Sequence, residues 1–172
     1  MTRNTSIKLL AGATGLLVGA LAAGCGSSGG SSASGSAPKT ASGRSATIGV
    51  ANNNLGKILV DSRGRTLYLF EKDSGTKSAC RGACAVEWPP LRAKGTPRVG
   101  SGANASSVAT SARPDGGAQV TYNGHPLYTF SADQKPGNSN GQGVNAFGGI
   151  WYVLSSAGDP ITTQTPNSGF GY

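Results

Sequence analysis

The sequence predicts an all-β fold in which two tandem β-meander repeats of about 60 residues each share one core. Two observations predict it. Short alternating or apolar runs are separated by Gly, Asn and Asp, a pattern typical of strands and turns. The segment LYLFEKD, residues 67–73, also returns as LYTFSAD, residues 127–133, at an offset of 60 positions. Few stretches carry helical periodicity, so we expect helices to be minor.

The first 24 residues predict a lipoprotein signal peptide. Arg3 and Lys8 precede an uncharged apolar run of 15 residues, 9–23, which is short for a membrane span and typical of a secretory signal. Small residues then lead to Cys25, and this ending resembles a bacterial lipobox. The resemblance implies cleavage before Cys25 and a lipid on its sulfur. Ordinary secretion, with Cys25 free or buried, is the alternative.

The rest of the chain divides by composition. Residues 25–46 hold the lipidated cysteine and a stretch of Gly, Ser, Ala and Thr, which cannot bury apolar surface and is predicted to be a flexible linker. A first repeat at 47–104 and a second at 105–163 together provide enough chain for one modest core. Residues 164–172 are predicted to be a loose tail.

Each repeat is predicted to begin with three strands and to end with a tryptophan in an apolar run. The tryptophans are Trp88 in WPPL and Trp151 in WYVL, and a glycine-bearing loop precedes each. The predicted strands are 47–51, 57–61 and 65–70 in the first repeat, and 107–111, 118–122 and 125–130 in the second.

A three-residue motif recurs in the third strand of each repeat: Tyr68, Phe70 and Asp73, then Tyr128, Phe130 and Asp133. Alternation along a strand places the tyrosine and the phenylalanine on one face, where we expect them to pack on a tryptophan of either repeat. The aspartate stands where the strand ends, so it can bond nearby backbone and fix a turn. On the other face Thr129 corresponds to Leu69, which predicts shallower burial in the second repeat.

These residues resemble a known family, the bacterial lipoproteins with a Y-x-[FWY]-x-x-D motif, also called the secreted repeat family. The resemblance rests on the two motif copies together with SACRGACAVEWPPL and TYNGHPLYTF, and it extends over residues 47–154. It implies exported, often lipid-anchored proteins built from this repeat. It implies no established reaction and no ligand.

Two cysteines, Cys80 and Cys84, remain when Cys25 carries a lipid. An even pair in an oxidising compartment predicts a disulfide, and Gly82 lets the short loop turn tightly. The alternative is a copper or redox site in which both thiolates and the single histidine, His125, hold the metal. His125 belongs to the other repeat and is predicted to be a turn residue in NGHP. We therefore expect a disulfide and no cofactor.

No catalytic constellation stands out, so we predict a protein that is not an enzyme. Asp73 and Asp133 could serve acid–base chemistry or bind calcium, but no D-x-D-x-D loop and no second histidine completes such a site. The glycine-rich segment 137–149 lacks the lysine of a phosphate-binding loop and is predicted to be a surface loop. If the protein binds a partner, we expect residues 81–88 and 137–149 to contribute.

The charge of the chain is +8, and without the signal peptide 13 basic residues stand against 7 acidic ones, a net charge of +6. The basic residues are scattered, which is typical of a solvated surface and suits contact with anionic lipid. An exported chain without a basic and aromatic groove pattern is not expected to bind nucleic acid. We expect a lipid-anchored binding or interaction module on the extracytoplasmic face of the cell membrane. Its partner would be an envelope protein or an anionic wall polymer.

Overall fold

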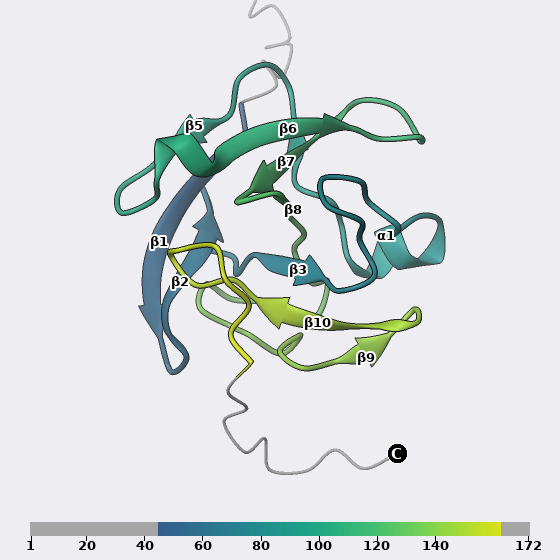
Figure 1. Ribbon diagram of the computed structural model, residues 1–172. Coiled ribbons are helices and arrows are strands. Elements are labelled where there is room, and N and C mark those ends of the chain that lie inside the picture. Colours follow the sequence, from purple (N-terminus) through teal and green to yellow (C-terminus); the bar gives the residue numbers. More distant parts are fainter. Residues whose placement is uncertain (1–44, 163–172) are drawn as a thin grey trace, which may run out of the picture. The chain divides into compact units, whose positions relative to one another are not determined.

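The computed structural model describes residues 45–162, so the signal peptide, Cys25, most of the linker and the C-terminal tail lie outside the described residues. Strands dominate this part of the chain, which confirms the all-β prediction. Short helices are α1 (Ala83–Glu87) and the 3-10 turn η1 (Ala105–Ser107). The strands are β1 (Thr47–Asn53), β2 (Gly56–Asp61), β3 (Tyr68–Phe70), β4 (Arg92–Ala93), β5 (Arg98–Val99), β6 (Val108–Ala112), β7 (Ala118–Tyr122), β8 (His125–Pro126), β9 (Asn145–Ala146) and β10 (Gly149–Val153) (Figure 1).

Each repeat begins with an antiparallel hairpin, β1–β2 in the first and β6–β7 in the second. The first hairpin turns at residues 54–55, so β1 runs two residues further than the predicted strand 47–51. In the β1–β2–β5 sheet the strand order is β2-β1-β5, and in the second hairpin's sheet it is β4-β7-β6, with β8 also paired to β7. The third sheet has the order β3-β10-β9.

The third strand of each predicted meander leaves its own hairpin and pairs with the other repeat. Thr66 still bridges Val60 of β2, but β3 then lies antiparallel to β10, with Tyr68 opposite Val153. In the second repeat Tyr128 bridges Pro90, next to Trp88 of the first repeat. The tyrosine strand of each repeat therefore lies beside the tryptophan segment of the other.

A pseudo-twofold relation between the repeats is visible in the backbone bonds at their centre. The N–H of Tyr68 donates to the carbonyl of Tyr128 at 2.9 Å, and the N–H of Tyr128 donates to the carbonyl of Tyr68 at 3.0 Å. The two motif segments thus meet at their tyrosines, and each copy of the motif faces the other. The predicted strand 125–130 is found only as β8, and Tyr128 makes isolated bridges beyond it.

Two buried clusters flank these motif strands, and both contain residues of the two repeats. The aromatic cluster contains Ile58, Val60, Tyr68, Phe70, Cys80, Cys84, Trp88, Tyr128, Trp151 and Val153. The aliphatic cluster contains Ile48, Leu59, Leu67, Leu69, Val120, Tyr122, Leu127 and Leu154. The predicted alternation is confirmed, because the motif tyrosines and phenylalanines face the first cluster and Leu67, Leu69 and Leu127 face the second.

The expectation of shallow burial at Thr129 is wrong, because its side chain is only 2% exposed. The segment that ends the first repeat covers it. The N–H of Thr129 donates to the carbonyl of Pro89 at 2.9 Å, and its hydroxyl lies 3.4 Å from the same oxygen. A threonine can therefore occupy this buried site with its hydroxyl satisfied. Within residues 45–162, neither helix approaches the length and apolar character that a membrane crossing requires.

Candidate functional site

Four aromatic rings stack at the junction of the two repeats. Phe70 stacks on Trp151 with ring centroids 4.1 Å apart, Trp151 stacks on Trp88 at 3.9 Å, and Trp88 stacks on Phe130 at 4.1 Å. Each phenylalanine therefore packs on the tryptophan of the other repeat, and the two tryptophans pack on each other. Both indoles are fully buried. We call these four residues the aromatic stack.

The motif tyrosines flank the aromatic stack edge-on. Tyr68 contacts Trp88 with centroids 5.4 Å apart, and Tyr128 contacts Trp151 at 5.1 Å, so each tyrosine packs on the tryptophan of its own repeat. Both phenol rings are fully buried, which leaves only their hydroxyl groups in need of partners.

Those hydroxyl groups bond to the aspartates of the opposite repeat. The hydroxyl of Tyr68 donates to Oδ2 of Asp133 at 2.6 Å, and the hydroxyl of Tyr128 donates to Oδ2 of Asp73 at 2.8 Å. The spacing within one motif copy is thus explained by contacts between copies. We call these two interactions the crossed pairs.

Each aspartate also fixes the loop that follows it. Oδ1 of Asp73 accepts the N–H of Ala79 at 2.7 Å, and Oδ1 of Asp133 accepts the N–H of Asn140 at 3.0 Å. The loops closed in this way are longer than the tight turns that the sequence predicted. One carboxylate therefore orders its own loop and joins it to the other repeat.

Burial dominates the electrostatics of the crossed pairs. It raises the pKa of Asp73 to about 6, against the opposing effect of the hydrogen bonds from Ala79 and Tyr128. Burial raises the pKa of Asp133 as well. The pKa values of Tyr68 and Tyr128 are raised first by burial and then by the nearby carboxylates, so both phenols keep their protons and act as donors.

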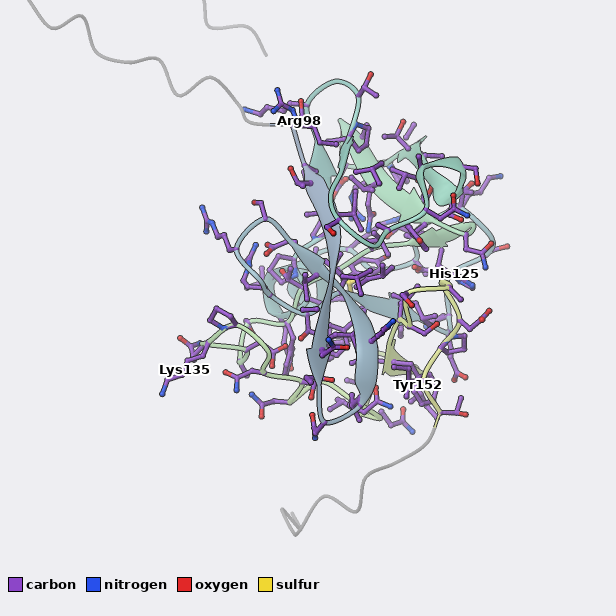
Figure 2. All side chains as sticks on the ribbon, turned by 90° about the vertical axis from the view of Figure 1, so that its left-hand side faces the viewer. Arg98, His125, Lys135 and Tyr152 are labelled. Carbon is purple, nitrogen blue, oxygen red and sulfur yellow. A yellow bond between two sulfur atoms is a disulfide. The ribbon has the colours of Figure 1, made fainter. Side chains whose placement is uncertain are left out.

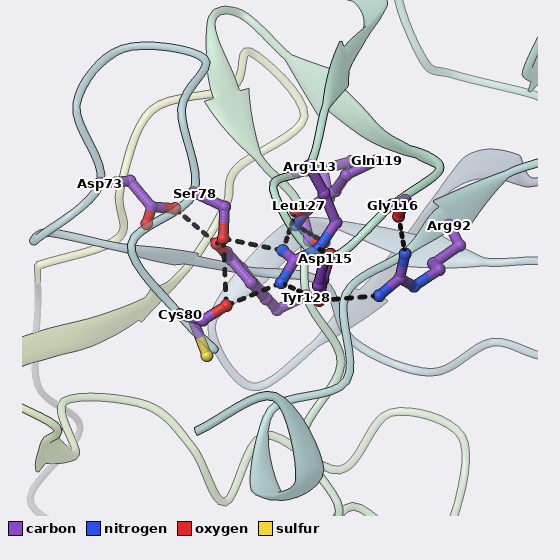
Figure 3. A network of polar contacts seen from close by, with 10 residues as sticks. All are labelled: Asp73, Ser78, Cys80, Arg92, Arg113, Asp115, Gly116, Gln119, Leu127 and Tyr128. Carbon is purple, nitrogen blue, oxygen red and sulfur yellow. Dashed lines mark hydrogen bonds and ion pairs between the residues drawn. The ribbon is translucent and has the colours of Figure 1, made fainter. Parts of the chain in front are cut away.

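Within residues 45–162, a buried arginine supports the pair of Tyr128 and Asp73, and no other arginine is buried at the pair of Tyr68 and Asp133. Tyr128 is also hydrogen-bonded to Oγ of Ser78 at 2.7 Å, and Nη1 of Arg113 donates to the same Oγ at 2.7 Å (Figure 3). The charge of Arg113 is balanced by Asp115, which accepts from Nε at 2.8 Å and from Nη2 at 2.9 Å. Gln119 completes this network by accepting from Nη1. At the other pair, Tyr68 instead accepts the N–H of Gly141 at 3.2 Å.

The site residues predicted from the sequence did not include Arg113, Ser78 or Gln119. Arg113 follows β6 at the start of a turn, where a charged residue ordinarily faces water. Gln119 lies in β7 between the apolar residues Ala118 and Val120. The alternation of apolar and polar residues alone does not distinguish it from a surface position. Only the pairing of β6 with β7 brings Arg113 and Gln119 together beneath the loop that contains Ser78.

The predicted disulfide is present. Cys80 and Cys84 are bonded, their Cα atoms lie 5.3 Å apart, and both side chains are buried in the aromatic cluster. The carbonyl of Cys80 accepts Nη2 of Arg113 at 2.7 Å, so the disulfide loop is tied to the second repeat.

The alternative copper site of Cys80, Cys84 and His125 does not assemble in the described part of the chain. Within residues 45–162 no three side chains of His, Cys, Asp or Glu come together in an arrangement that could hold a metal ion. His125 starts β8 after a turn at Asn123 and Gly124, both with positive φ, and Figure 2 places it on the outside of the structure.

The two loops predicted to contribute to binding carry exposed apolar side chains. Val86 of α1 is 77% exposed, and Phe147 is 40% exposed at the turn between β9 and β10. Phe147 and Gly148 have φ values of 57° and 84°, a geometry that hairpins normally build with Asn-Gly or Asp-Gly. Holding a bulky aromatic residue there costs about 1–3 kcal/mol. Nζ of Lys72 donates to the carbonyl of Phe147 at 3.3 Å and supports the turn.

The fold and the site define a duplicated β protein whose repeated motif forms the junction between its halves. The chain belongs to the family described as secreted repeat of unknown function, which matches residues 49–92 and 109–155. The matches begin in β1 and β6, and each extends past one tryptophan of the aromatic stack. The family description is consistent with an extracytoplasmic module. No curated protein and no solved structure matches the chain.

Proposed function

We propose that the protein is a lipid-anchored, non-enzymatic interaction module on the extracytoplasmic face of the cell membrane. The anchor is supported by the apolar run at residues 9–23 and by Cys25 after its small residues. A family described as secreted supports the location.

The burial of the shared motif supports a structural role for the residues that a catalytic proposal would need. Asp73 and Asp133 are the paired carboxylates, and each accepts one tyrosine hydroxyl and one backbone N–H. A general acid or base must reach a substrate proton. These carboxylates instead accept hydrogen bonds from tyrosine hydroxyls and backbone N–H groups of the protein itself. The motif therefore builds the scaffold, and binding is assigned to the loops.

The proposed interaction role rests on the exposed side chain and the positive φ of Phe147. An aromatic side chain that is half-exposed on a strained hairpin turn contributes little to the buried core. Backbone outliers of this kind are concentrated at functional positions. An apolar tip suits a protein partner better than an anionic polymer. Arg98 and Lys135 lie far apart from each other in Figure 2, whereas a polyanion is attracted most strongly by basic side chains gathered on one face. We therefore propose an envelope protein as the partner.

Two experiments test the anchor and the interaction separately. Replacing Cys25 with Ser is expected to release the protein from the membrane fraction into the medium, and retention of the variant would contradict the anchor. For the interaction, a photo-crosslinking phenylalanine analogue replaces Phe147 in living cells. The matched control places it at Arg63, an exposed residue on the turn after β2.

A discrete crosslinked protein band from position 147 and none from position 63 is the expected result. The same bands from both positions, or none from either, would overturn the proposed role of Phe147. A copper site using Cys80, Cys84 and His125 would require free thiolates, whereas the two cysteines are joined. A redox function of the cysteine pair would instead require the disulfide to be reduced and re-formed.

A further inference from the structure

The outer edge of β6 differs from the outer edge of its counterpart β1. Both are the first strand of a repeat, both form a hairpin with the next strand, and their sequences correspond at an offset of 60 positions. Ile48 and Val50 of β1 correspond in this way to Val108 and Thr110 of β6. The two strands therefore present equivalent backbone groups to their outer sides.

The outer edge of β1 is occupied by the segment that links the two repeats. Strand β5 lies parallel to β1, with Ile48 opposite Val99. The N–H of Gly100 donates to the carbonyl of Ile48, and the N–H of Val50 donates to the carbonyl of Ser101 at 3.1 Å. The connecting segment therefore acts as an added strand that satisfies this edge.

The outer edge of β6 has no such strand within residues 45–162, because β6 is the last strand of its sheet (Figure 1). The N–H of Arg113 donates to the carbonyl of Gly117, and the N–H of Asn123 donates to the carbonyl of Ser107. In an antiparallel pair only every second residue bonds the partner strand, so the N–H and carbonyl of Thr110 point away from β7. Thr110 and its neighbours Ala109 and Ala112 are exposed.

The segment that follows β10 takes a different path from the segment that follows the first tryptophan. It folds back on β10, where Leu154 bridges Pro160 and the N–H of Ile161 donates to the carbonyl of Val153 at 2.9 Å. The described end of the second repeat therefore does not cover β6, although the corresponding end of the first repeat covers β1.

The sequence of β6 also lacks the features that usually protect an open edge. VATSA contains no charged residue and no proline, and its register with β7 has no bulge. Proteins generally block exposed edges by one of these means, because a regular uncharged edge invites another strand.

We propose that the outer edge of β6 binds an extended peptide segment of a protein partner, added as a parallel strand with glycine at alternate positions. The bound segment at β1 supplies the model for this specificity. A side chain at Gly100 would lie 3.2 Å from the carbonyl oxygen of Ile48, and one at Gly102 would lie 3.0 Å from Cβ of Val50. Thr110 is β-branched like Val50, so it imposes the same demand for glycine. Main-chain bonds supply the affinity of such strand addition.

The test uses a synthetic peptide of residues 96–103, TPRVGSGA, titrated into the full chain. Thr110→Pro removes the outward N–H and leaves the bonds to β7 in place, because proline is tolerated on an edge strand. Thr110→Val keeps that N–H and is the matched control. Thr110→Lys, which adds a charge to the edge, is the second variant should the proline variant not fold. A control peptide carries valine at both glycine positions.

We expect saturable binding of the glycine peptide to the wild type and to Thr110→Val at or below about 1 mM, and binding at least about tenfold weaker to Thr110→Pro and Thr110→Lys. No binding to the wild type, equal binding to Thr110→Lys, or equal binding of the valine peptide would overturn the proposal. The inference rests on the proposed interaction role but concerns another surface. Loss of peptide binding with crosslinking at Phe147 intact would refute this inference alone.

Discussion

The two loops that lead to the tryptophans solve the same problem by different means. Both must carry the chain from a motif aspartate to the aromatic stack. In the first repeat a disulfide and Arg113 hold the loop, through the carbonyl of Cys80. In the second repeat backbone packing holds it, because Gly141 lies so close to Trp88 that an added Cβ would approach the indole within 2.6 Å.

The centre of the molecule, by contrast, is nearly the same from either side. The aromatic stack and the crossed pairs repeat their distances within a few tenths of an ångström, as 4.1 Å and 4.1 Å for the phenylalanine contacts show. The junction therefore constrains both copies, whereas each loop needs only some means of reaching it.

Truncating either tryptophan should destabilise the protein equally. Trp88→Ala and Trp151→Ala each remove the centre of the aromatic stack and leave a cavity, at a cost of about 3–5 kcal/mol in the free energy of unfolding. Denaturant unfolding of the two variants measures it. If one variant loses less than half as much unfolding free energy as the other, the two repeats do not contribute equally to the junction.

The crossed pairs predict which double mutants interact. Tyr68→Phe leaves the Asp133 carboxylate without its phenol donor and should cost about 1–3 kcal/mol, as should Asp133→Asn or Asp73→Asn. In a double-mutant cycle, Tyr68→Phe should couple with Asp133→Asn and be additive with Asp73→Asn. Coupling within one repeat in place of coupling between repeats would contradict the crossed arrangement.

Removing the disulfide should affect the first loop only. Cys80→Ser with Cys84→Ser opens a short loop, which should cost about 2 kcal/mol on the chain-entropy estimate. Hydrogen exchange is expected to speed up around Ser78 and Arg113 and to stay unchanged around Gly141. Intact mass spectrometry of the wild type provides the control, because reduction should add two hydrogen masses and release no metal. Free thiols with a bound metal would overturn the disulfide assignment.

The two motif aspartates predict a modest dependence of stability on pH. The pKa of Asp73 is about 6 in the folded protein against an ordinary value of 3.8, so the folded state holds this proton more tightly than the unfolded state. The associated stabilisation is complete below about pH 4 and is lost as the pH rises through 6. Asp133 shifts in the same direction.

Asp115 acts oppositely and only at lower pH, because the hydrogen bond from Arg113 lowers its pKa to about 2. The melting temperature should therefore fall between pH 4.5 and pH 7, and Asp73→Asn should flatten that slope. If neither Asp73→Asn nor Asp133→Asn changes the slope of melting temperature against pH, the pH dependence does not come from these two aspartates.

Local patterns in the sequence identified much of the fold. Alternation correctly assigned Tyr68 and Phe70 to one face and Leu67 and Leu69 to the other, and the 60-residue offset identified the duplication. The cysteine pair, in a chain expected to be exported, predicted the disulfide. These features depend on neighbours in the sequence or on composition, which a single sequence displays directly.

The exchange of strands between repeats could not be read in the same way. Whether Tyr68 bonds Asp73 or Asp133 depends on which tryptophan segment lies beside β3, and the two repeats offer chemically identical choices. Arg113 was missed for a related reason, since its burial follows from the docking of the loop of residues 74–82 onto β6 and β7. Thr129 was misjudged because the covering segment comes from the other repeat.

The crossed pairs also affect how such a protein can fold when its concentration is low. A single repeat would contain a tyrosine and an aspartate that cannot bond each other, and half of the aromatic stack, so it would need a second repeat to fold. Joining both repeats in one chain replaces an encounter that depends on concentration with an internal one, at an effective concentration in the millimolar range for a short connection. Separately produced halves, residues 45–104 and 105–162, should therefore be unfolded alone and fold when mixed, with a transition that weakens on dilution. The intact chain needs no such excess, because each copy carries both halves of the junction.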